Sequence, residues 1–250
     1  MAERKGVYFV SDVHLGLEVK DPADREARFV SFLRSIPKDT TLALYLLGDI
    51  WDFWYEYRDV VPKGYVRVFA ALMDLIDAGV KVYFFPGNHD IWCYGYFASM
   101  GITVVHDQPQ LVEIGGKVFC IGHGDGLGPG LGGYKFMNSV FKCRFVQRLF
   151  STLHPWIAFR LGKGWSRHSR LARNEEYVFR GPDEPLYKWA LEFSERTHVD
   201  CFIFGHLHAQ ADLTLPTGAR LIVMKDWIDR SQYWYFDGIL VGVGHSMNTE

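Results

Sequence analysis

The stretch that decides the fold is Phe85-Pro-Gly-Asn-His-Asp-Ile-Trp92, which continues directly from the apolar run at residues 80–85. Pro, Gly, Asn and Asp all favour turns, so the simplest interpretation is a turn at the end of a strand. Asn, His and Asp can also bind a metal ion or transfer a proton. The residues that follow the other predicted strands are needed to choose between these two interpretations.

The same pattern recurs at four further positions in the chain. Each short apolar run is typical of a strand buried on both faces, and each ends in a polar cluster. The runs at 7–10, 42–47, 80–85, 118–121 and 201–204 end in Ser-Asp-Val-His (11–14), Gly-Asp (48–49), Gly-Asn-His-Asp (87–90), Gly-His-Gly-Asp (122–125) and Gly-His-Leu-His (205–208).

In segments between these runs, apolar residues recur at helical spacing. This spacing covers residues 29–36, 69–76 and 186–193, and Gly79 follows the second segment as a C-terminal cap. Strands that alternate with helices predict an α/β layered fold. Near the C-terminus, the runs at 221–224, 232–236 and 239–241 predict successive antiparallel strands instead.

The polar residues at the strand ends form a candidate metal site. The carboxyl ends of parallel strands share one edge of a sheet, where α/β proteins build their sites. Asp49 alone could be a helix N-cap, and His14 or His123 alone could be ordinary loop histidines. Together, seven oxygen and nitrogen ligands without cysteine suit two divalent ions such as Mn²⁺, Fe²⁺ or Zn²⁺, bridged by a carboxylate. The seven are Asp12, His14, Asp49, Asn88, His123, His206 and His208.

Composition predicts a globular protein without a polyanionic partner. The 250 residues are 48% hydrophobic and 22% charged with a net charge of -2, which fits one domain over residues 1–250 and gives no reason to expect nucleic acid. Cys120 and Cys201 lie in apolar runs, which predicts buried free thiols and a reducing compartment. We find no signal peptide and no apolar run of the ~18 residues that a membrane span needs.

Residues 127–180 differ from the rest of the chain. They contain ten basic and two acidic side chains, a net charge of +8, and no clear strand. Met137, Phe141, Phe145 and Leu149 recur every four residues, which predicts two or more helices with an apolar and a basic face. Such an insert could be a substrate lid that also docks on anionic lipid, or a helical cap with solvated basic faces.

The five ordered motifs resemble those of the calcineurin-like metallophosphoesterase superfamily across nearly the whole chain. The resemblance implies a four-layer α/β/β/α sandwich with a dinuclear metal site. One ion would be held by Asp12, His14 and His208, the other by Asn88, His123 and His206, and Asp49 would bridge them. His89 would face the substrate as a catalytic residue, with Asp90 orienting it.

A narrower resemblance suggests the substrate. Gly48-Asp-Ile-Trp-Asp-Phe-Trp54 and the His-Gly-Asp stretch before the insert are similar to the UDP-2,3-diacylglucosamine diphosphatases of lipid A synthesis. That family implies peripheral binding at the cytoplasmic face of the inner membrane. It also implies cleavage of an acylated UDP-sugar to 2,3-diacylglucosamine 1-phosphate and UMP, with manganese the first metal to expect.

Within that resemblance the insert would be the lid. Ser166, Arg167 and Arg170 are the candidates for phosphate and sugar contacts, and Phe141 and Phe145 for acyl-chain contacts. Typical members have Arg where this chain has His89, which can donate a proton. The alternatives are a phosphodiesterase or nucleotidase for a soluble nucleotide or nucleic acid, and a scaffold without catalysis.

Overall fold

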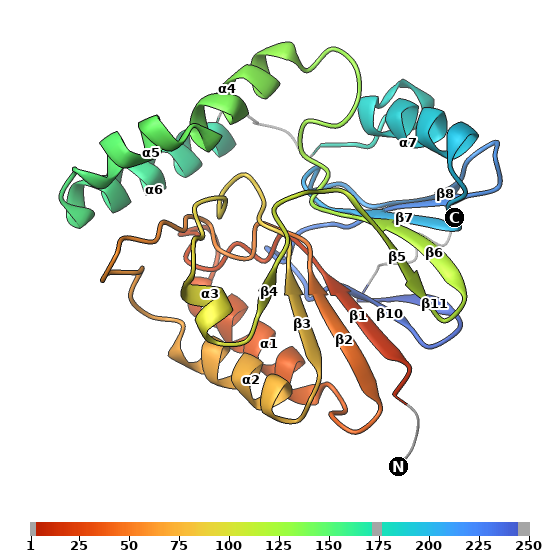
Figure 1. The fold of residues 1–250 in the computed structure, drawn as a ribbon, viewed down its shortest axis with the longest axis horizontal. Coiled ribbons are helices and arrows are strands. Elements are labelled where there is room, and N and C mark those ends of the chain that lie inside the picture. The colour runs from red at the N-terminus through yellow and green to blue at the C-terminus, as the bar shows by residue number, and fades with distance from the viewer. Residues whose placement is uncertain (1–3, 172–176, 245–250) are drawn as a thin grey trace.

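The computed structural model describes residues 4–171 and 177–244, with the backbone alone for 167–171, and contains two β-sheets (Figure 1). The first sheet has the order β11 (Leu240–Val243), β10 (Tyr233–Phe236), β1 (Gly6–Val10), β2 (Thr41–Leu46), β3 (Lys81–Phe84) and β4 (Thr103–Val104). The second has the order β5 (Gln110–Ile114), β6 (Lys117–Ile121), β7 (Cys201–Phe204), β9 (Arg220–Val223) and β8 (Ala211–Thr214).

The helices divide into covering layers and an arm. The first sheet is covered by α1 (Pro22–Ser35), α2 (Val66–Asp77) and α3 (Tyr96–Ser99), and the second by α7 (Pro185–Arg196), which follows the 3₁₀ turn η1 (Gly181–Asp183). The arm consists of α4 (Gly132–Lys142), α5 (Arg144–Ser151) and α6 (Pro155–Leu171), and it projects beyond the sheets in Figure 1.

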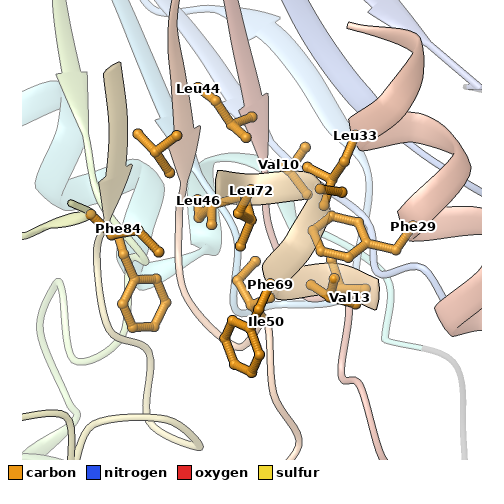
Figure 2. Close-up of a cluster of buried hydrophobic side chains, with 14 of the residues drawn as sticks. Val10, Val13, Phe29, Leu33, Leu44, Leu46, Ile50, Phe69, Leu72 and Phe84 are labelled. Carbon is orange, nitrogen blue, oxygen red and sulfur yellow. The ribbon is translucent and has the colours of Figure 1, made fainter. Parts of the chain in front are cut away.

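Three apolar cores separate four layers, which confirms the predicted α/β/β/α sandwich. Alternate side chains of a strand point to opposite faces, so Phe9 packs between the sheets and Val10 packs toward the helices. Figure 2 shows the helix-side core, where Phe29 of α1 and Phe69 of α2 meet the strand side chains. Leu186 of α7 closes the third core, against the outer face of the second sheet.

Local signals explain where the helices begin and end. The Asp21 carboxylate accepts hydrogen bonds from the backbone N–H groups of Ala23 and Asp24, both at 3.0 Å, and Pro22 occupies the first position of α1. Gly79 follows the C-cap of α2 with φ +86°, a left-handed conformation that favours glycine. The three helices predicted from apolar spacing are therefore confirmed.

One detail of the predicted fold is wrong. Residues 221–224 do not pair with the last two strands: β9 lies in the second sheet, parallel to β7 and antiparallel to β8, while β10 and β11 pair with each other in the first. The prediction of two or more helices in the insert is confirmed, because the chain is extended at Cys143 and separates α4 from α5. No helix in the described ranges is both long and apolar enough to cross a membrane.

Candidate metal centre

The predicted metal ligands all follow strands whose carboxyl ends meet at one edge. β1, β2 and β3 are parallel neighbours in the first sheet, and β6 and β7 are parallel neighbours in the second. The β1–β2 ladder continues into the loops, because the Asp12 N–H donates to Gly48 O at 3.0 Å and the His14 N–H donates to Asp49 O at 2.9 Å. These bonds fix the loop after β1 against the loop after β2.

The first group of ligands contains Asp12, His14 and His208. Asp12 Oδ1 lies 3.7 Å from His14 Nε2 and 3.8 Å from His208 Nε2. One ligand atom from each residue falls within a 4.8 Å cluster, and the His14 and His208 rings stack with centroids 4.9 Å apart. An ion could contact all three side chains at once.

A second group contains Asp49, His123 and His206, with Asn88 beside it. His123 Nε2 lies 3.4 Å from Asp49 Oδ2 and 3.3 Å from Asn88 Oδ1. The same Asp49 oxygen lies 3.9 Å from His14 Nε2 in the first group. Asp49 therefore stands between the two groups, where a bridging carboxylate is needed.

His89 belongs to a third cluster, with His14 and Asp49. Its Nε2 lies 3.9 Å from Asp49 Oδ2, and its backbone N–H donates to Asp49 Oδ1 at 2.9 Å. The His89 side chain is 13% exposed, whereas those of His14 and His123 are fully buried. His89 therefore lies against the cluster and is also partly accessible to an incoming substrate.

The imidazole rings are held from behind by protein acceptors. Nδ1 of His123 lies 2.9 Å from Leu47 O, Nδ1 of His208 lies 2.9 Å from a carboxylate oxygen of Asp226, and Nδ1 of His89 lies 2.9 Å from Asp52 O. Each acceptor favours a proton on Nδ1, so that Nε2 of His123 and His208, once deprotonated, can direct a lone pair toward the cluster. This is how metal-binding histidines are usually oriented.

The charges of the centre also fit metal ions. Burial raises the pKa of Asp12. Burial acts in the same direction on Asp49, but the imidazoles of His123 and His89 hold its pKa well below the usual range. Burial acts to lower the pKa of His123, yet the Asp49 carboxylate raises it well above its usual range. Such an imidazole must release its proton before Nε2 can bind an ion, so ion binding and proton release are coupled.

The donor set passes a chemical test for divalent ions. Asp12 and Asp49 are almost fully buried, and within the described residues neither forms an ion pair with a lysine or arginine. Buried charges are normally paired or bound to metals. Carboxylate, amide and imidazole donors without thiolate suit Mn²⁺, Fe²⁺ or Zn²⁺. The residues present therefore fit two ions.

Backbone strain is concentrated at the centre. Seven described residues other than glycine have a positive φ, and five of them are predicted ligands, namely Asp12, His14, Asp49, His206 and His208. A left-handed conformation costs about 1–2 kcal/mol per residue, and such strain gathers at functional sites. Gly87 and Gly205 permit the close packing, because a Cβ on either would clash with the carboxylate of Asp49 or Asp12.

The prediction that Asp90 orients His89 is wrong. The buried Asp90 carboxylate accepts hydrogen bonds from the backbone N–H groups of Gly87 at 2.7 Å and Ile50 at 2.8 Å, with longer bonds from Asp49 and Trp51 at 3.2 Å. Burial and the Asp49 carboxylate raise its pKa to about 7. Asp90 therefore joins the loops after β2 and β3, and the carbonyl of Asp52 orients His89.

Three residues that support the centre were not predicted. Asp226 follows β9 and holds His208, and the apolar run before it was the available signal. The guanidinium of buried Arg25 donates to His14 O at 2.8 Å and to Val19 O at 2.6 Å, which fixes the loop that carries His14. Asp52 places a carboxylate oxygen 3.5 Å from His14 Nδ1.

The predicted substrate residues have different positions. Ser166 is buried in α6, and its hydroxyl donates to the Asp52 carboxylate at 2.8 Å, so it links the arm to the metal centre. Phe141 is half-buried between Trp92 and Trp165, with ring centroids 5.5 and 5.7 Å away. Phe145 is 74% exposed on α5 and is not brought to the centre. The side chains of Arg167 and Arg170 lie outside the described residues.

The arm is attached to the sandwich by aromatic residues of two loops. The hydroxyl of Tyr55 donates to Gln147 O at 2.8 Å, and the hydroxyl of Tyr57 donates to Leu153 O at 3.1 Å. The indole N–H of Trp92 donates to Phe141 O at 3.0 Å. The loops after β2 and β3 thus carry predicted metal ligands and also support the arm.

Comparisons with known proteins agree with this geometry. The family model for calcineurin-like phosphoesterases matches residues 6–210. The UDP-2,3-diacylglucosamine hydrolase of Porphyromonas gingivalis is 34% identical, covering 94% of this chain and 95% of the relative. The hydrolase of the same name from Klebsiella pneumoniae is 29% identical, covering 94% and 93%. A solved dimetal phosphatase from Danio rerio shares the fold with a TM-score of 0.50 at 13% identity, covering 97% of this chain and 96% of its own. The chain belongs to the calcineurin-like phosphoesterase family.

Proposed function

We propose that this metal-dependent hydrolase cleaves the pyrophosphate of UDP-2,3-diacylglucosamine in lipid A biosynthesis. The products are 2,3-diacylglucosamine 1-phosphate (lipid X) and UMP. The observation that carries the proposal is the arm of exposed apolar helices joined to the metal centre through Ser166 and Asp52. The relatives that bear the name of this hydrolase support it, since they match nearly the full length of the chain.

Two divalent ions complete the centre in this proposal, manganese first, with iron or zinc as alternatives. One would be held by Asp12, His14 and His208 and the other by Asn88, His123 and His206, with the Asp49 carboxylate available to both. Bound ions polarise phosphoryl oxygens and lower the pKa of bound water to near neutrality. The protein contributes a fixed, buried set of donors that needs little reorganisation when the substrate arrives.

His89 supplies the proton for the leaving group. The Asp52 carbonyl accepts from Nδ1, so the proton to be donated must be carried on Nε2, the nitrogen that faces the centre. The partial exposure of His89 lets the leaving oxygen approach this nitrogen. The hydrogen bond from the His89 backbone N–H to Asp49 Oδ1 holds the proton donor beside the cluster.

The arm selects the acylated sugar in this proposal. Phe141 and Phe145 contact acyl chains, and Arg167 and Arg170 contact the phosphates and the sugar. Ser166 is revised from a substrate contact to an anchor, because its hydroxyl is already bonded to Asp52 in a buried position.

The same arm binds the membrane surface in this proposal. The arm exposes Trp156 and Leu161 together with basic side chains, a combination that suits an interface with anionic lipid. The protein would then act as a peripheral protein on the cytoplasmic face of the inner membrane, where an acylated substrate is available.

A turnover assay with Mn²⁺ tests the proposal. UDP-2,3-diacylglucosamine, UDP-glucose and bis-p-nitrophenyl phosphate are compared at equal enzyme concentration. We expect strong preference for the acylated substrate, with UMP released. Hydrolysis of the diester without any turnover of the acylated substrate would retain the dinuclear hydrolase and refute the lipid assignment.

A further inference from the structure

A cavity of about 900 Å³, with charged side chains in its lining, lies between the arm and the sandwich. Its lining includes Gly87, His106 and Gln108 from the sandwich and Lys142, Arg144 and Arg148 from the arm. We call this space the polar cavity. Its volume lies within the roughly 300–1,000 Å³ typical of small-molecule sites.

The inner wall of the polar cavity is built from the loops of the metal centre. Gln108 Oε1 accepts the backbone N–H of His123 at 2.7 Å, and Gln108 Nε2 donates to Pro86 O at 2.6 Å. Gly87 directly precedes Asn88. A ligand in the polar cavity therefore lies next to two of the predicted metal ligands.

The charges of the polar cavity favour an anion. Lys142, Arg144 and Arg148 make no hydrogen bond or ion pair to the described residues, and all three are exposed to the cavity or solvent. His106 of the sandwich and Lys142 of the arm line the same cavity, and burial and the Lys142 ammonium lower the pKa of His106. The lining thus presents free cations beside the phosphoryl-binding centre.

The two acids of the lining do not cancel these cations. The Glu56 carboxylate accepts hydrogen bonds from the backbone N–H groups of Tyr94 at 2.5 Å and Gly95 at 2.8 Å. Its negative charge therefore interacts with N–H groups at the start of α3. The Asp125 carboxylate accepts from the Tyr134 hydroxyl at 3.1 Å and from Asn138 Nδ2 at 2.9 Å. Both acids are therefore already occupied by donors of the protein.

Acyl chains do not fit this lining, because they would bury three or more cations without a counter-charge. A nucleotide fits it well. Its phosphate can pair with the arm cations, and Tyr57 and Tyr94, which also line the cavity, offer faces on which a base can stack. We propose that the polar cavity is the subsite for the uridine monophosphate half of the substrate, with Lys142 and Arg148 as its phosphate contacts.

This inference rests on the proposed function, and it fixes the direction of the substrate. The UMP half would lie along α4 and α5, and the acylated half would leave the metal centre toward another face of the arm. The product UMP would then leave the enzyme through the polar cavity.

UMP binding to the manganese-loaded full chain tests the subsite by isothermal titration calorimetry. The variant Lys142→Ala/Arg148→Ala is compared with Lys135→Ala/Lys163→Ala, which removes the same charge from the same arm but not from the polar cavity. Loss of a contact to a charged group weakens binding by roughly tenfold to a hundredfold. We expect that increase in the Kd of UMP for the first variant alone, with unchanged metal content and circular dichroism for both.

The outcomes separate the subsite from the function. Equal UMP affinity in both variants and the wild type, or an equal loss in both variants, overturns the subsite even if the acylated substrate is hydrolysed. A selective loss in Lys142→Ala/Arg148→Ala supports the nucleotide subsite even if no acylated substrate is hydrolysed, in which case the lipid assignment is the claim that fails.

Discussion

The metal centre and the arm are built in opposite ways. The predicted ligands Asp12, His14 and His123 are fully buried, and several of the predicted ligands have left-handed backbones that the surrounding strands hold in place. On the arm, no residue of α4 or α5 is buried, and Phe145 is 74% exposed. In the proposed function, the sheets fix the chemistry and the arm selects the substrate.

This division of roles can be tested by substitution. A change in the centre should alter metal binding or turnover for every substrate. A change on the arm should alter the choice between substrates and leave metal content constant. The point where the two regions meet, Asp52 with Ser166, should show a mixed effect.

The largest effect is expected for Asp49→Ala. Asp49 stands between the two ligand groups, so both ions should be lost, and turnover should fall by more than about a thousandfold. Elemental analysis of the purified variant measures the ions, and Asp39→Ala, at an exposed carboxylate, is the control. Retention of one ion per chain would refute the bridging role.

His89→Ala should come next. The proton donor is lost while the ligand groups remain, so kcat should fall by about 10²- to 10⁴-fold with both ions retained. His198→Ala serves as the control because that imidazole is 77% exposed on the surface. If kcat were unchanged, His89 would have no part in the reaction, and if an ion were lost, His89 would be a ligand.

Ser166→Ala should have a smaller effect on both regions. It removes a buried hydrogen bond to a carboxylate, which should lower the free energy of unfolding by about 1–3 kcal/mol. Because Asp52 also faces His14, kcat/KM should fall for small and acylated substrates alike. Urea denaturation measures stability beside Ser139→Ala, whose hydroxyl donates to Lys135 O within α4. Equal stability of the two variants would contradict the anchor.

The smallest effect on stability is expected for Phe145→Asp. An exposed side chain contributes little to folding, so the free energy of unfolding should change by no more than about 0.5 kcal/mol. Phe141→Asp should cost more, since Phe141 packs on Trp92 and Trp165. Both variants should lose kcat/KM on the acylated substrate more than on bis-p-nitrophenyl phosphate. Equal losses on the two substrates would limit these residues to a structural role.

The sequence was most informative where local signals and tertiary structure agree. Buried parallel strands need continuous apolar runs, and their carboxyl ends share one edge of a sheet, so an α/β fold and the cluster of polar residues at the strand ends could be predicted. The four layers followed from the family resemblance. Asp90 was misassigned because proximity in sequence suggested contact with His89, whereas its carboxylate binds backbone N–H groups of two different loops.

Contacts between distant segments explain what could not be predicted. Arg25 and Asp226 reach the centre from α1 and from the end of β9, and no local pattern marks either as a partner of His14 or His208. Which of the two sheets β9 joins depends on how all the strands pair with one another. The extent of the domain, residues 1–250, and the roles of Arg167 and Arg170 stay predictions.

The most direct test of the account is a crystal structure of the manganese-loaded protein with anomalous diffraction data. We predict two anomalous peaks, one among Asp12, His14 and His208 and the other among Asn88, His123 and His206, with the Asp49 carboxylate touching both ions. A single peak, or two peaks without Asp49 between them, would contradict the dinuclear centre on which the proposed reaction depends.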